Sequence, residues 1–75
     1  MTIHEAHRLS ELEEVLGELH CVENTEIGLI AVIGKISVLL PENLAMKLQG
    51  MLGRRVAVIR LEGYRLRCLD GDEHV

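Results

Sequence analysis

The sequence predicts a single small α+β domain, in which an N-terminal helix is followed by a β-hairpin, a short helix and a second β-hairpin. Leucines recur at helical spacing near the N-terminus, and two later stretches rich in β-branched residues each contain a glycine in the middle. A proline and a second leucine stripe separate these two stretches. The chain has 75 residues, enough for one domain. We divide it into an acidic helical segment, residues 1–23, and a ββαββ core, residues 27–70.

The N-terminal segment has the pattern of an amphipathic helix. Four leucines are spaced by three, four and three residues, as expected for one helical face: Leu9, Leu12, Leu16 and Leu19. Ser10 with Glu13, and Thr2 with Glu5, have the spacing of a capping box. The helix is therefore expected to begin either near residue 3 or near residue 11.

The next stretch, GLIAVIGKISVLLP, predicts a hairpin. With Gly34-Lys35 as a two-residue turn, Ile33 faces Ile36 and Ile30 faces Leu39. Both faces of this hairpin are then largely apolar. A two-stranded ribbon cannot bury both faces unaided, so we expect it to lie in a barrel interior or against a second subunit.

Pro41 ends this hairpin, and residues 42–52 predict a short helix that stops at Gly53. Its expected buried stripe has helical spacing: Leu44, Leu48, Met51 and Leu52.

Residues 54–70 predict the second hairpin, with Glu62-Gly63 as its turn and Arg60 opposite Arg65. One face is then apolar and consists of Ala57, Ile59, Leu61, Tyr64, Leu66 and Cys68. The opposite face carries Arg60, Arg65 and Arg67 among aliphatic residues.

A different interpretation takes residues 18–23 (ELHCVE) as a further strand. The order then becomes three strands, a helix and two strands, as in an OB-like β-barrel. Such barrels bind single strands through aromatic stacking platforms. Tyr64 is the only aromatic residue of the chain, so this binding mode has little support from the sequence.

The stretch from Gly34 to Leu69 resembles the AbrB-type swapped-hairpin domains, which include transition-state regulators and MazE-like antitoxins. The matching positions are Gly34, Lys35, Pro41, Leu44, Leu48, Gly53 and Val56. The gap from Gly34 to Pro41 is two residues longer than in that pattern, and the residue before the proline is Leu40 instead of isoleucine. The resemblance implies an intertwined swapped-hairpin homodimer that binds DNA.

Charge is strongly segregated along the chain. Residues 35–67 contain seven basic residues and two acidic ones, whereas residues 1–34 contain seven acidic residues and one basic one. Six of the basic residues are the candidate nucleic-acid-binding residues: Lys35, Arg54, Arg55, Arg60, Arg65 and Arg67. We therefore expect a small nucleic-acid-binding or regulatory module that uses a basic hairpin face. The alternative is a homodimeric protein-interaction module with no nucleic-acid role, whose arginines pair with its own or a partner's carboxylates.

Other functions have little support. No nucleophile motif, phosphate-binding glycine loop or paired acid–base site is present, so we expect no enzymatic activity, no catalytic residues and no cofactor. The histidines and the two cysteines lack metal-ligand spacing, which predicts no metal site, and we expect Cys21 and Cys68 to be reduced, buried thiols. No signal peptide or membrane-spanning segment is visible, which favours a cytoplasmic protein with no membrane partner.

Overall fold

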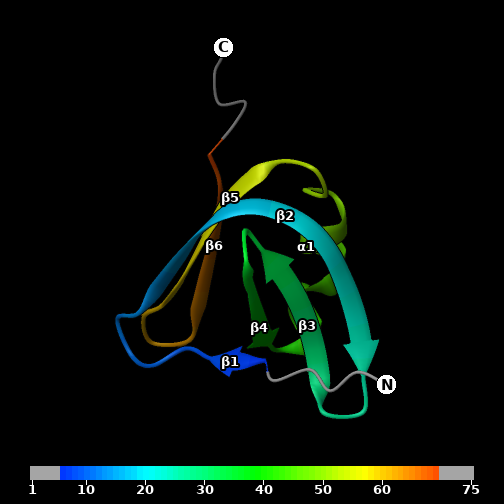
Figure 1. Ribbon diagram of the computed structural model, residues 1–75. Helices are drawn as coiled ribbons and strands as arrows, with labels where there is room; N and C mark the ends of the chain where they lie inside the picture. Colours follow the sequence, from blue (N-terminus) through cyan, green and yellow to red (C-terminus); the bar gives the residue numbers. More distant parts are fainter. Residues whose placement is uncertain (1–5, 70–75) are drawn as a thin grey trace.

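The computed structural model describes residues 6–69 and corrects the predicted fold class, because the protein is mostly β. Its elements, in chain order, are β1 (His7–Arg8), β2 (Glu14–Thr25), β3 (Gly28–Ile33), β4 (Ile36–Leu40), the short helical turn η1 (Glu42–Leu44), α1 (Ala45–Gln49), β5 (Arg55–Arg60) and β6 (Tyr64–Cys68). The strands form one curled sheet, a half-barrel, in the order β1-β4-β3-β2-β5-β6 (Figure 1). The predicted α+β packing, as a swapped-hairpin dimer or an OB-like barrel, is therefore wrong. The alternative interpretation of residues 18–23 as a strand is confirmed, because they lie within β2 and the order after β1 is three strands, a short helical segment and two strands.

The strand β2 connects the two halves of the sheet. Its first part, residues 14–18, pairs with β5, and its second part, residues 19–25, pairs with β3. The register shifts between Leu19 and Cys21, where the strand passes from one partner to the other. Figure 1 shows β2 arching over the molecule, with the two hairpins on either side beneath it.

No N-terminal helix forms in the described residues, so that prediction is wrong. Val15 and Leu19 are buried, whereas Glu14, Leu16 and Glu18 point away from the core with the alternation of a strand. Leu12, a member of the supposed apolar stripe, is 67% exposed and has a φ of 70°, which no helix accommodates.

The Ser10–Glu13 capping-box signal corresponds to real hydrogen bonds in a different setting. The Ser10 amide donates to the Glu13 carboxylate at 2.8 Å, and the Glu13 amide donates to the Ser10 carbonyl at 2.9 Å. These bonds close a turn that leads into β2. The spacing therefore corresponds to a real turn, and its interpretation as the start of a helix was wrong.

The pairing predicted for the first hairpin is confirmed: Ile33 faces Ile36 and Ile30 faces Leu39 in β3 and β4. Gly34 has a φ of 62°, the left-handed conformation that the first position of such a turn requires. Leu29, Ala31 and Ile33 point into the core, and Ile30 and Leu39 on the other face are also buried. The single chain therefore buries both apolar faces, and this hairpin gives no reason to expect a second subunit.

The helix after Pro41 is shorter than predicted and ends at Gln49. Leu48 is fully buried, and Leu44 and Met51 pack against the core, as the stripe predicted. Leu52 lies beyond the helix and is exposed, so its assignment to the stripe was wrong.

The register predicted for the second hairpin is wrong by one residue. Arg60 faces Tyr64, and Ile59 faces Arg65, because Leu61, Glu62 and Gly63 form a three-residue loop in which Glu62 and Gly63 have positive φ. A shift of one residue turns one strand over relative to the other. The inner face therefore carries Val56, Val58, Arg60, Tyr64, Leu66 and Cys68, and the outer face carries Arg55, Ala57, Ile59, Arg65 and Arg67.

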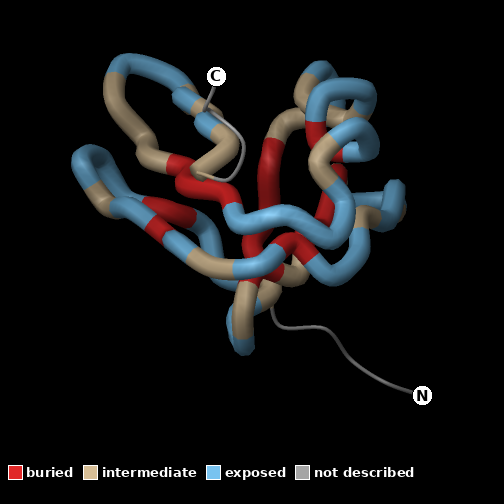
Figure 2. Tube along the Cα trace, turned by 90° about the horizontal axis from the view of Figure 1, so that it is seen from above, coloured by how far each residue is buried: buried red, intermediate tan, exposed pale blue. Residues whose placement is uncertain are grey.

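The core lies where β2 crosses the two hairpins, and α1 covers one end of it. Its fully buried side chains come from the segment before β2, from β2 itself, and from β3, β4, α1 and β5: Leu9, Leu19, Leu29, Ile33, Val38, Leu48, Val56 and Val58. Figure 2 shows these buried positions at the centre and the exposed loops outside. Since the chain is small, each of these contacts is a substantial part of its stability.

We expect Leu48→Ala to lower the free energy of unfolding by about 2–5 kcal/mol, because it empties a fully buried site beneath the sheet. Met46→Ala is the matched control, since Met46 lies in the same helix and is 88% exposed. Its effect should stay within about 0.5 kcal/mol. Urea denaturation compares the two, and equal losses would show that the buried face of α1 is misassigned.

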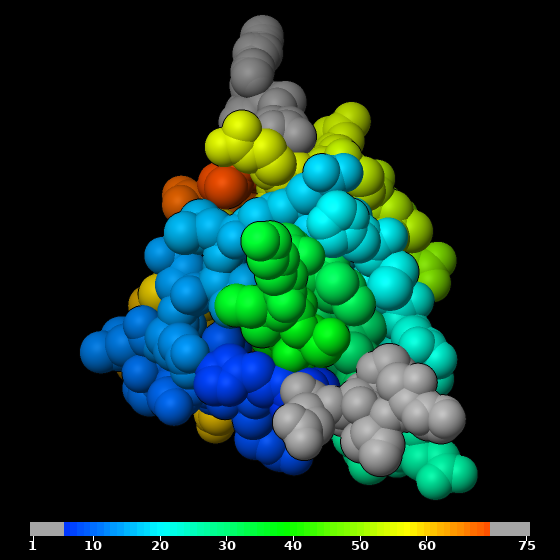
Figure 3. Space-filling view, viewed as in Figure 1, coloured from blue at the N-terminus to red at the C-terminus, as the bar shows by residue number. Residues whose placement is uncertain are grey.

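Gly17 provides a second test, because β2 and the β3–β4 turn approach each other closely there. A Cβ on Gly17 would lie 3.1 Å from the backbone nitrogen and 3.2 Å from the Cα of Gly34. In the space-filling view the green tip of this hairpin lies against the blue and cyan β2 segment (Figure 3). We expect Gly17→Ala to cost about 1–3 kcal/mol more than Gly53→Ala, because the Gly53 position also has positive φ but no neighbour within 4 Å. Equal unfolding free energies for the two variants would contradict a tight contact.

Candidate functional site

The structure separates the six candidate basic residues into four places. Lys35 lies in the exposed turn between β3 and β4, and Arg54 lies before β5, with its Nη1 3.9 Å from the Cys68 sulfur. Arg60 belongs to the inner face of the second hairpin. Arg55, Arg65 and Arg67 remain together on the opposite side. Three of the six candidate residues therefore share one face of the sheet.

These three arginines lie on what we call the outer face, the side of β2, β5 and β6 that points away from the core. The outer face carries Glu14, Leu16, Glu18, Arg55, Ala57, Ile59, Arg65 and Arg67. The registers align Glu14, Ile59 and Arg65 in one row across the strands, and Leu16, Ala57 and Arg67 in the next. A third row contains Glu18 and Arg55. The face therefore has acids on β2 and arginines on β6, and the β5 residues between them are Arg55 and the apolar Ala57 and Ile59.

The charges of the two outer strands do not meet within one chain. Glu14 and Arg65 are separated by the full width of β5, about 10 Å between backbones. Within residues 6–69, neither Glu14 nor Arg65 takes part in an ion pair. A shallow hollow of about 360 Å³ lies between Glu14, Ile59 and the two β6 arginines.

Arg60 has a role that the predicted register concealed. Its guanidinium donates to the Leu9 carbonyl at 3.0 Å and lies 5.5 Å from the centre of the Tyr64 ring. It also approaches Glu11 at 3.9 Å, a partly exposed contact that adds little stability. Arg60 therefore joins the segment before β2 to the start of β6.

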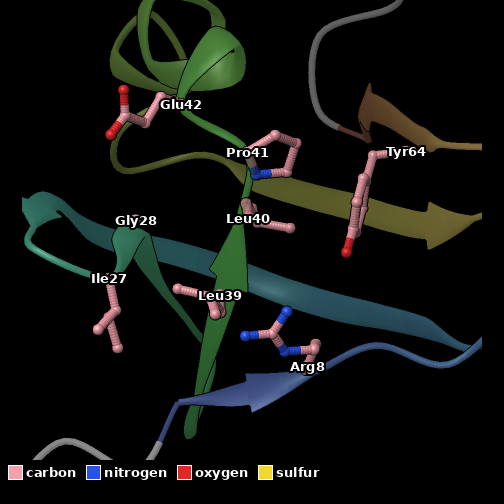
Figure 4. Close-up of a pocket in the computed structure, with 8 residues that line it drawn as sticks. All are labelled: Arg8, Ile27, Gly28, Leu39, Leu40, Pro41, Glu42 and Tyr64. Carbon is pink, nitrogen blue, oxygen red and sulfur yellow. The ribbon is translucent and has the colours of Figure 1, made fainter.

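A cleft of about 380 Å³ opens on the inner side of β6, where the half-barrel is not closed. Its walls are contributed by β1, the β2–β3 turn, the end of β4 and the start of β6: Arg8, Ile27, Gly28, Leu39, Leu40, Pro41, Glu42 and Tyr64. Figure 4 shows Tyr64 on one side, Pro41 and Leu40 opposite, and the Arg8 guanidinium reaching up from β1. The Glu42 carboxylate points away from the other polar groups.

Arg8 is held in position by its neighbours. Its backbone pairs with Leu39 of β4, and the next residue, Leu9, is almost fully buried. On the other side, His7 Nε2 lies 2.7 Å from the Glu13 carboxylate. The Ser10 amide bond and, second, the His7 contact lower the pKa of Glu13 below its ordinary value of 4.5.

Sequence reasoning did not find this cleft. Residues 8, 40 and 64 are distant in the chain, and they meet because β1 pairs with β4 while β6 leaves the opposite edge open. Tyr64 lies on an apolar face, as expected, but that face is the inner one with Val58 and Leu66, and the half-buried ring lines the cleft. Tyr64 is the only aromatic residue of the chain, so no group of aromatic residues in the sequence indicated a site.

The remaining sequence expectations concern thiols, metals and membranes. Cys21 and Cys68 are not joined by a disulfide, but Cys21 is exposed and Cys68 is only half-buried, so the expectation of buried thiols was wrong. Among residues 6–69, no group of three or more His, Cys, Asp or Glu side chains lies close enough to hold a metal ion. No helix in this part of the chain has the length and apolar character needed to cross a membrane.

Comparisons with protein families, with curated proteins and with solved structures found no match to this chain. The site must therefore be interpreted from its own geometry.

The Glu13 contacts make stability depend on pH. A carboxyl whose pKa is lowered by folding stabilises the protein above its ordinary pKa of 4.5, and this stabilisation is lost as the pH falls through the folded-state value. We expect Glu13→Gln to be less stable than the wild type at pH 7, with the difference closing below pH 4.5. Urea denaturation at several pH values measures this.

Glu26→Gln is the matched control, because Glu26 is exposed in the β2–β3 turn and its carboxylate forms no ion pair with another residue of the range 6–69. It should follow the wild type at every pH. A constant difference between the wild type and Glu13→Gln from neutral to acid pH would contradict a stabilising charge at Glu13.

Proposed function

We propose that this protein is a homodimeric protein-interaction module, in which the outer face of one copy binds the outer face of another. The observation that carries this proposal is the arrangement of charge on that face, with acids on β2 and arginines on β6. A surface with both signs in separate stripes is complementary to a copy of itself in one orientation. Self-association through one shared patch is the commonest form of protein assembly.

The positions of the acidic and basic stripes determine which direction of the two-fold axis places opposite charges over one another. If the two-fold axis runs in the interface parallel to β5, β2 of one copy lies over β6 of the other. Glu14 then faces the partner's Arg65, and the apolar β5 residues Ala57 and Ile59 lie along the axis. An axis perpendicular to the strands would instead place acids over acids. Arg55 comes near its own counterpart at the axis, where Glu18 in the same row offsets the repulsion.

Apolar surface supports the same arrangement. Leu16 is 57% exposed beside Ala57 and Ile59, so burying it against a second copy removes apolar area from water. The face spans three short strands and is smaller than the roughly 800 Å² per partner of a typical stable interface. We therefore expect a weak dimer in the micromolar range or above, and one that salt weakens.

Nucleic-acid binding remains a prediction with less support. The outer face has three arginines and two glutamates, and the whole chain has a formal charge of −4. Phosphate backbones are bound through cationic surfaces with few competing acids. The loss of Arg60 to the inner face removes the Arg60–Arg65 pair on which that prediction depended.

Charge reversal tests the proposed dimer. We expect Glu14→Lys and Arg65→Glu each to weaken self-association about tenfold or more, since each places like charges opposite one another. An equimolar mixture of the two variants should associate again, because every facing pair then has opposite signs. The double variant should also recover. Sedimentation equilibrium of the 8.4 kDa chain at low and high salt measures each case.

The mixture is the decisive sample. If Glu14 and Arg65 paired within one chain, the double variant would regain self-association, but the mixture of the two single variants would not. Lys47→Glu is the control, because Lys47 lies on α1, away from the outer face, and should leave association unchanged. A monomer at all concentrations, together with salt-sensitive binding of a DNA or RNA oligonucleotide that Arg65→Glu abolishes, would reject the dimer and favour nucleic-acid binding.

A further inference from the structure

We infer that the cleft between β1, the end of β4 and β6 binds a small molecule with a flat apolar body and one anionic group. This site is separate from the outer face, because Tyr64 lies on the inner side of β6 and Arg65 on the outer side. The inference therefore does not depend on the proposed dimer.

Two hydrogen-bond donors are directed into the cleft. The Arg8 guanidinium and the Tyr64 hydroxyl both point into the space below Pro41 in Figure 4. Neither group makes a side-chain hydrogen bond or ion pair with another residue in the range 6–69. An anionic oxygen placed between them can accept from both, and charge-assisted bonds of this kind are the strong ones. The polar end of the cleft thus favours a carboxylate or phosphate.

The remaining walls are apolar. Leu39 and Leu40 are buried in the sheet, and Pro41 stands across the cleft from the Tyr64 ring. A volume of about 380 Å³ falls in the range of small-molecule sites. A flat group between Pro41 and the tyrosine ring would contact apolar atoms on both faces.

The backbone that carries Arg8 and the ring of Tyr64 are held by contacts outside the cleft. Arg60 binds the Leu9 carbonyl, directly after Arg8, and places its guanidinium over the Tyr64 ring. Arg8 is further held by the β1–β4 pairing. A ligand therefore does not have to order this backbone on binding, which lowers the entropic cost. Arg60 is a positioning residue in this scheme and does not line the cleft.

Glu42 restricts the ligand's charge. It is on the rim, and its carboxylate is directed away from Arg8. A single anionic group can bind Arg8 at a distance from Glu42, whereas a second negative charge at the Glu42 end would be repelled. Aromatic carboxylates and nucleoside monophosphates share the required chemistry.

Two matched pairs of probes test the inference: benzoate against benzamide, and adenosine 5′-monophosphate against adenosine. Amide NMR shifts of the full-length protein give the affinity and location of each. We expect one anionic probe to bind about tenfold or more tightly than its neutral partner, with shifts centred on residues 8, 39–41 and 64. The anion that binds more tightly identifies the source as carboxylate or phosphate.

Arg8→Gln should remove the preference for the anion. Arg65→Gln, which removes the same charge from the other side of β6, should preserve it. Tyr64→Phe keeps the ring and should weaken the anion about threefold or more through loss of one hydrogen bond. Equal binding of charged and neutral probes, equal losses from Arg8→Gln and Arg65→Gln, or no binding by any probe at millimolar concentration would overturn the inference.

Discussion

The fold depends on one strand, β2, that pairs with a strand of each hairpin and so joins the two halves of the sheet. Its first part pairs with β5 and its second part with β3, so its backbone has to bend sharply while both ladders stay hydrogen-bonded. Gly17 allows the β3–β4 turn to approach β2 closely, because a Cβ on residue 17 would lie 3.1 Å from the backbone nitrogen of Gly34. The Gly34 amide also donates to the Glu18 carbonyl at 2.8 Å. The contact between two glycines therefore fixes where the second sheet half begins, and the positions of both hairpins follow from it.

The bent strand curls the sheet but does not close it, and the open seam determines what the remaining edges can do. β1 covers two residues of β4, and β6 ends the sheet on the other side. Arginines at alternate positions of β6 protect this edge from pairing with another strand, since charged side chains are a common defence of sheet edges. The same opening separates Tyr64 from Leu40 and so forms the cleft. The cleft is thus a consequence of incomplete closure.

The sequence predicted the local hairpins better than the long-range arrangement. The register of β3 and β4 followed from a two-residue turn with glycine at its first position, which is a local signal. The helix predicted from four leucines failed because those leucines do not share one element. Leu16 and Leu19 lie in β2, with Leu16 facing outward, whereas Leu12 lies in the turn before it. The β5–β6 register failed for a related reason. Glu62 takes a positive φ that its residue type rarely adopts, so the loop gained a residue and Arg60 turned inward.

The topology of the sheet determines how the charges segregated along the chain are arranged on the surface. The acidic N-terminal stretch becomes β2, the basic stretch becomes β5 and β6, and the sheet order makes them neighbours. Charges that looked like separate acidic and basic regions thus become parallel stripes on one face, spaced by the width of a strand. The carboxylates and guanidinium groups of the two stripes are too far apart to neutralise one another directly. They are close enough that a phosphate backbone bound to the arginines would also be repelled by the glutamates. A partner with the opposite stripe order avoids this conflict, and a rotated copy of the same face has that order.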